Sequence, residues 1–227
     1  MTLTDCTWTG YAAGDGSSGN EAVYVNIAAG SMNLTIDGGT TPSVRTAGCT
    51  VTVISGAVAF TVTVKDTASP PQPINGARVL LTAANDTGPM PYQESVTIAN
   101  SGTTATVTHT AHGMASNDKV LIVGASLAAN NGVFTITKTD VDTYTYTMLS
   151  EPGENPTGTI TSTYVALSGT TNASGIITDS RVFVSDQPVS GWARKSTSPP
   201  LYQQGPITGT IESDVGFSSI IQLIPDE

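Results

Sequence analysis

The sequence predicts an all-β protein: an antiparallel β-sandwich (Ig/transthyretin-like) with an inserted small β-barrel domain and an N-terminal β arm. Three observations indicate this class. Apolar and polar residues alternate with a period of two along the chain, and no segment shows the 3.6-residue period of an amphipathic helix. Clusters of Gly, Pro, Asn and Asp separate the alternating runs, as in sandwiches and barrels.

The first strands are expected within residues 23–64. Four runs there alternate β-branched or aliphatic residues with polar ones: Val23–Ile27, Met32–Ile36, Cys49–Val53 and Phe60–Val64. This pattern is typical of half-buried antiparallel strands. Asp37-Gly38-Gly39 has turn composition and closes the second run. We therefore expect residues 1–55 to form an N-terminal arm that contains a β-hairpin.

The sandwich is predicted from residues 56–92 and 162–227. The Pro-rich stretch 69–73 cannot supply the N–H groups of a central strand, so it is a connection to the strand that begins at Ala77. The Gly76-Ala77-Arg78-Val79 motif and the turn of residues 171–175, before a strand at 181–184, resemble the transthyretin-like or carboxypeptidase-regulatory sandwich. Asn172 stands where that family has Asp. The resemblance implies a sandwich split by an insertion.

Residues 93–161 have a different texture. Gly113 follows a histidine, Asp118 precedes a Val strand, an Asn131-Gly132 pair precedes Phe134, and residues 143–145 read Thr-Tyr-Thr. This order resembles a small β-barrel module that recurs in tail, fibre and other structural proteins of bacteriophages. The resemblance implies a virion protein. Asn131-Gly132 predicts the positive φ angles of a tight hairpin, and Gly113 and Gly124 predict corners.

Composition and charge exclude some partners. Charged residues make up 11% of the chain, against about 25% in ordinary globular proteins. Such charge-poor, Thr-rich surfaces suit β proteins that pack laterally against neighbours. The net charge is −10 with only 8 basic residues, and Arg194-Lys195 is the one adjacent pair, which argues against nucleic acid as a partner.

The N-terminus and the cysteines bear on the compartment. Residues 1–5 lack the basic and apolar regions of a signal peptide, and no run approaches the ~20 apolar residues of a membrane span. We expect synthesis in the host cytoplasm and residence in the virion, with no membrane partner. Cys6 and Cys49 could pair if the arm folds back; alternatively, Cys49 is a small buried hydrophobe.

Several residues could carry chemistry, and each also has a structural interpretation. His109 and His112 could bind a metal, but at this spacing in a strand they point to opposite faces, which favours one turn histidine and one surface histidine. Residues 15–21 could bind calcium or form a flexible link. No Gly-x-Ser-x-Gly elbow supports a hydrolase. Acids occur in predicted turns rather than as a pair: Asp15, Asp37, Asp66, Asp86, Asp140 and Asp142. We predict no catalytic residue, no metal, no cofactor and no enzyme activity.

Aromatic residues offer one alternative function. Trp192, beside Arg194 and Lys195, could form a sugar platform with Tyr202 and Tyr92, although a strand Trp more often belongs to a core. The sequence therefore predicts a capsid decoration (cement) protein or a neck or tail accessory subunit. Its partners would be the major capsid protein or neck and tail subunits, and it would form a homo-oligomer. The alternatives are a receptor- or carbohydrate-binding module of a tail or head fibre and, more remotely, a virion depolymerase.

Overall fold

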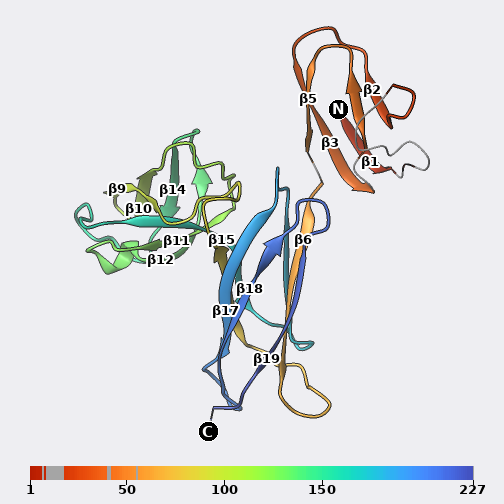
Figure 1. Cartoon of the computed structure of the whole chain (residues 1–227). Helices are drawn as coiled ribbons and strands as arrows, with labels where there is room; N and C mark the ends of the chain where they lie inside the picture. Colours follow the sequence, from red (N-terminus) through yellow and green to blue (C-terminus); the bar gives the residue numbers. More distant parts are fainter. Residues whose placement is uncertain (7, 9–17, 40–41, 55, 227) are drawn as a thin grey trace. The chain divides into compact units, whose positions relative to one another are not determined.

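The computed structural model describes residues 1–6, 8, 18–39, 42–54 and 56–226. Across these residues the chain is all-β with several antiparallel sheets, which confirms the predicted class. Contacts divide it into two compact units, coloured along the sequence in Figure 1. The first holds residues 1–59, 180–186 and 212–216, and the second holds 60–179, 187–211 and 217–227. The three domain boundaries predicted above stay a prediction. The described part of the chain has no helix that is long and apolar enough to cross a membrane.

The N-terminal strands pair in parallel, which corrects the antiparallel arm and its hairpin. The strands are β1 (Thr2–Cys6), β2 (Val23–Val25), β3 (Ser31–Gly39), β4 (Val44–Thr46) and β5 (Thr50–Ile54). Their orders are β1-β3-β5 and β2-β4, and every pair is parallel. Val23 pairs with Val44 and Ser31 with Thr50, so the chain advances by 21 and 19 residues between paired positions. It coils around instead of turning back, and the predicted turn at residues 37–39 lies inside β3.

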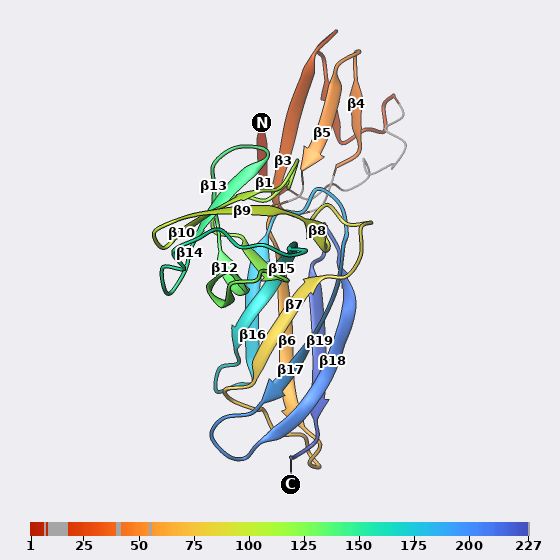
Figure 2. The same ribbon diagram turned by 90° about the vertical axis from the view of Figure 1, so that its left-hand side faces the viewer.

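The sandwich lies in the second unit and has two sheets (Figure 2). Its strands are β6 (Val58–Asp66), β7 (Arg78–Ala83), β15 (Thr161–Thr170), β16 (Ile176–Arg181), β17 (Gln187–Lys195), β18 (Tyr202–Ile211) and β19 (Phe217–Leu223). One sheet runs β15-β7-β17-β18 with antiparallel neighbours, and the other runs β16-β6-β19. Buried aliphatic residues from both sheets form the core: Val62, Val64, Leu81, Val189, Ile207 and Leu223.

Two strand predictions in the sandwich are wrong in detail. β6 pairs with β19 in parallel, so the run Phe60–Val64 is not wholly antiparallel. The strand that follows the turn, β16, begins at Ile176 and ends at Arg181. The strand was expected at residues 181–184, so the prediction placed it too late in the chain. The turn itself is confirmed. Gly175 has φ +72°, and the Asn172 side-chain oxygen accepts the N–H groups of Ser174 and Ile176.

The segment between β7 and β15 contributes to two sheets. It contains β8 (Glu94–Ser95), β9 (Thr97–Ser101), β10 (Thr104–Thr108), β11 (Lys119–Val123), the 3-10 turn η1 (Ala128–Asn130), β12 (Gly132–Thr135), β13 (Thr137–Lys138) and β14 (Thr143–Thr147). Strands β13-β14-β10-β9 form their own antiparallel sheet, whereas β12-β11 extends the large sandwich sheet through β15. The segment therefore shares a sheet with the sandwich.

Glycines lie at the predicted corners of this segment, but Asn131 and Gly132 do not form the predicted two-residue hairpin turn. Gly113 and Gly124 have φ of +65° and +83°, as predicted. Asn131, however, has φ −98°, so it is not part of a two-residue turn. Its side chain instead bonds the backbone of Ala125 and Leu127, which closes an eight-residue loop between β11 and β12 (residues 124–131).

Candidate functional site: the open end of the N-terminal coil

The parallel coil of β1–β5 has a small apolar interior. Val25, Leu34, Ile36 and Cys49 are buried, and each comes from a position where the sequence alternates apolar and polar residues. Cys49 forms no disulfide bond and is 6% exposed. Cys49 is therefore the small buried hydrophobe of the two interpretations given above.

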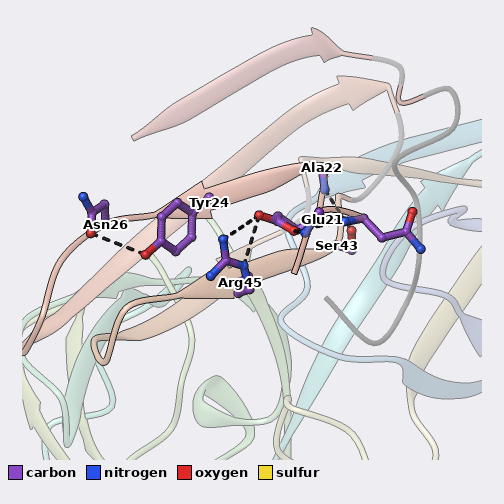
Figure 3. Close-up of polar contacts among 8 residues, drawn as sticks. Glu21, Ala22, Tyr24, Asn26, Ser43 and Arg45 are labelled. Atoms are coloured by element: carbon purple, nitrogen blue, oxygen red, sulfur yellow. Dashed lines mark hydrogen bonds and ion pairs between the residues drawn. The ribbon is translucent and has the colours of Figure 1, made fainter. Parts of the chain in front are cut away.

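An ion pair joins successive turns of the coil (Figure 3). Tyr24 and Arg45 are paired across β2 and β4, and the guanidinium lies 3.8 Å from the centroid of the Tyr24 ring. Its Nε and Nη2 donate to Oε1 of Glu21 at 3.0 and 2.8 Å. The bonds from Arg45 lower the pKa of Glu21 to about 2.

Glu21 also bears on the calcium hypothesis. Its second oxygen accepts the N–H groups of Gly19 and Asn20, so both carboxylate oxygens have protein partners. The rest of the predicted calcium loop, residues 15–17, lies outside the described residues.

Strand β5 leaves one edge of the coil without a partner. Within the described chain, β5 pairs only with β3. The N–H of Thr50 donates to the carbonyl of Gly30 at 2.9 Å, which lies just before β3. Because successive N–H groups of a strand point to opposite sides, those of Val51 and Val53 point away from β3.

Strand β4 repeats this arrangement on the same turn of the coil. It pairs only with β2 among the described residues, and the N–H of Ala47 donates to the carbonyl of Val25 at 3.0 Å. The N–H of Thr46 therefore points outward as well. An open strand edge is a template on which another strand can add hydrogen bonds, so this end of the coil is the candidate interface.

The two histidines do not lie as predicted. Both are buried, and their ring centroids are 5.8 Å apart. The prediction of opposite faces assumed one continuous strand, but β10 ends at Thr108, and Ala111 takes a left-handed φ of +49°. The chain turns there and brings both rings against Tyr144.

The histidine cluster is partly unsatisfied in hydrogen bonding. Burial lowers the pKa of His109 to about 4. Nδ1 of His112 accepts the N–H of Met114, but Nε2 of His112 and Nδ1 of His109 have no hydrogen-bond partner among the described residues. Both rings border a cavity of about 230 Å³ together with Tyr92. Sequence reasoning missed this cluster, and the Gly113 corner after His112 was the signal that the strand had already ended.

The acids are partly where the sequence placed them. Asp140 and Asp142 lie in the turn before β14, where Asp142 accepts the N–H of Ala111. Asp37 lies within β3 and is not a turn residue. Asp66 ends β6, and its Oδ1 accepts the N–H groups of Ala68 and Gln72 in the connection that follows. Asp15 lies outside the described residues. No group of three or more His, Cys, Asp or Glu side chains that could hold a metal occurs among the residues described.

The proposed aromatic platform is not one surface. Trp192 is half-buried and borders a cavity of about 150 Å³, whereas Tyr92 borders the histidine cavity. Tyr202 is buried. Of the three aromatic candidates, Trp192 alone therefore keeps an accessible place on the face of the sandwich.

No protein-family model and no curated protein matches the chain. Two solved structures are similar at a low level. The endosialidase of phage phi92 has a TM-score of 0.27 and 15% identity, over 61% of this chain and 22% of its own. The shaft pilin SpaA of Lactobacillus rhamnosus GG has a TM-score of 0.32 and 10% identity, over 82% of this chain and 52% of its own. This chain thus spans about a fifth and about half of the two, and these likenesses carry no argument about function.

Proposed function

We propose that this chain is a virion structural protein, a capsid decoration or neck or tail accessory subunit, that acts by assembly with other subunits. The observation that supports this most is the open edge of β4 and β5. Among the described residues, the last turn of the coil has no partner strand beyond β4 and β5, and unpaired backbone groups at such an edge are satisfied best by another strand.

The surface chemistry beside this edge suits a protein partner. Thr50 and Thr52 are exposed on β5, and neither carries charge. Burying a threonine hydroxyl against a neighbour costs less than burying a charge, which needs a paired counter-ion. A stable interface buries about 1,600 Å² in total, so the edge would be the centre of a larger contact.

A second candidate function is carbohydrate binding, as in a fibre module. Half-buried Trp192 on the face of the sandwich favours it. The two functions use different units of the chain, so they do not exclude each other.

The assembly role predicts where the chain is found. Density-gradient-purified particles should contain it as a fixed number of copies per particle by quantitative mass spectrometry. Hundreds of copies would indicate the shell, and a few to a few tens would indicate the neck or tail. Absence of the chain from pure particles would contradict the proposal.

A substitution tests the edge itself. Thr52→Lys places a charged side chain on β5. Natural proteins use charged side chains, especially lysine, to prevent an edge strand from pairing with another chain. Thr104→Lys is the matched control, because Thr104 is also exposed but β10 pairs on both sides. We expect Thr52→Lys to abolish self-association in light scattering and incorporation into particles, and Thr104→Lys to leave both unchanged. Equal behaviour of the two variants would show that this edge is not the interface.

A further inference from the structure

The outer face of the large sandwich sheet holds two opposed arginines. Arg78 on β7 and Arg194 on β17 are direct cross-strand partners, so their side chains leave the same face of the sheet. Both are exposed, and neither makes a hydrogen bond or ion pair with a described residue. Like charges directly opposite each other destabilise a sheet. Although the net charge of the chain is −10, no acidic side chain of the described residues pairs with either arginine.

Trp192 lies two positions from Arg194 and faces the same way. Its cross-strand partner is Leu80, which is also half-buried, while Val79 and Ala193 point into the core. The alternation therefore places an indole ring, an aliphatic side chain and two guanidinium groups on one outward surface.

A recess of about 150 Å³ opens on this surface. Its border is formed by Arg78 and Leu80 on β7, Trp192 on β17, Ser168 and Thr170 on β15, and Val133 on β12. The ammonium of Lys119 donates to the carbonyl of Ser168 at 3.3 Å, so a third cation lies beside the recess. A recess of this volume can hold a single ring of a small ligand, whereas a protein partner makes a broad, flat contact.

We infer that this recess binds an acidic saccharide, a sugar ring that carries a carboxylate, as in a uronic or sialic acid. The guanidinium of Arg78, which borders the recess, receives the carboxylate through two parallel N–H···O bonds. The face of the indole carries partial negative charge and packs against the C–H face of the sugar ring. The hydroxyls of Ser168 and Thr170 are hydrogen-bonding groups for the sugar hydroxyls. This inference rests on the second candidate function, carbohydrate binding, and is independent of assembly.

The test uses the full chain and four probes: sialyllactose, trigalacturonic acid, neutral lactose and a short poly-glutamate peptide. We expect binding of at least one acidic sugar by isothermal titration and by saturation-transfer NMR, with no binding of lactose or the peptide. Because the contact is charge-assisted, the affinity should fall as salt is raised.

Two variants locate the site. Arg78→Gln should weaken binding at least tenfold, and Lys138→Gln, which removes the same charge from β13 in another sheet, should leave it unchanged. Trp192→Phe should weaken binding as well, and thermal unfolding would check that each variant folds.

The possible outcomes distinguish failure of the acidic-saccharide inference from failure of carbohydrate binding, the function on which it rests. Lactose binding as tight as the acidic sugars would overturn the acidic specificity but keep carbohydrate binding. No binding to any sugar would overturn both. Peptide binding that is as tight as sugar binding and is lost in Arg78→Gln would replace the saccharide with an acidic protein partner.

Discussion

The N-terminal coil and the sandwich use the same sequence pattern to build opposite kinds of sheet. In the coil, alternating runs pair in parallel at steps of 21 and 19 residues, and the last turn is left open. In the large sandwich sheet, alternating runs pair in antiparallel fashion around an aliphatic core. Alternation thus specifies that a segment is a strand and which face it buries, but not the direction of its partner.

The difference also shows in how each region is held together. The coil has few buried side chains and joins its turns through Glu21 and Arg45. The sandwich depends on buried aliphatic side chains such as Leu81 and on turns such as that at Asn172. We therefore expect the two regions to respond differently to truncation, acid and salt.

The largest expected effect comes from core truncation. Leu81→Ala should lower the free energy of unfolding of the sandwich by about 2–5 kcal/mol, because it leaves a cavity in a fully buried site. Leu34→Ala should instead destabilise the coil and leave the sandwich transition in place. Trp8 lies in the first unit and Trp192 in the second, so Trp→Phe variants at each position let fluorescence follow the units separately during urea unfolding. A single transition moved equally by both alanine variants would contradict this separation.

Acid should distinguish the regions next. The pKa of His109 is lowered from 6.5 to about 4, so the unfolded chain binds a proton between these values that the folded chain does not. Stability is therefore lost as pH falls from 6.5 to 4, by about 3 kcal/mol in total from this group. Urea titrations at pH 7 and pH 4 should show a smaller loss in His109→Phe than in the wild type. Identical losses in the two proteins would mean that His109 is not held neutral.

The coil should respond in a lower pH window. The pKa of Glu21 is lowered from 4.5 to about 2, so its ion pair contributes fully above pH 4.5 and is lost between pH 4.5 and about 2. Hydrogen exchange of residues 18–54 should therefore change little between pH 6.5 and 5 after correction for intrinsic rates.

Turn chemistry gives a smaller effect. Asn172→Ala removes an acceptor for two backbone N–H groups and should cost the sandwich about 1–2 kcal/mol. Asn172→Asp keeps the oxygen and restores the residue of the transthyretin-like turn, so it should unfold within about 0.5 kcal/mol of the wild type. Thermal unfolding of the two variants side by side measures the difference, and equal losses would exclude the hydrogen-bonding role.

The smallest expected effect is at the ion pair. Glu21→Gln should lower the melting temperature of the coil slightly at low salt, and the difference should shrink in 1 M NaCl because salt screens an ion pair that is partly accessible to solvent. Glu151→Gln is a control at an exposed acid with no described partner. A difference that persists at high salt would assign the effect to packing.

The sequence predicted the positions of the strands better than it predicted which strands pair and in which direction. Period-two alternation located β2, β3, β5 and β6, and Gly113, Gly124 and Asn172 marked real corners, because φ angles and side-chain caps are local properties. Strand direction was missed in the coil because it depends on which distant segment a strand meets. The turn composition of residues 37–39 was overridden by pairing with β1.

The candidate sites show the same limit. The burial of His109 beside His112 follows from the left-handed turn at Ala111. Residues other than glycine rarely adopt a left-handed φ, so an alanine in the sequence does not predict such a turn. Likewise, the opposition of Arg78 and Arg194 requires the register of β7 and β17. The sequence suggested Trp192 as a sugar-binding residue from its type alone. The position of Arg78 near it could be known only from the pairing of β7 with β17.

Hydrogen–deuterium exchange of the free and the assembled protein tests the docking role of the coil most directly. In the free chain, the outward amides of Thr46, Val51 and Val53 should exchange fast while that of Thr50, bonded to Gly30, is slower. On assembly, the segment 44–54 should become protected more than any other. Unchanged exchange in this segment, with new protection only on the sandwich, would contradict the account.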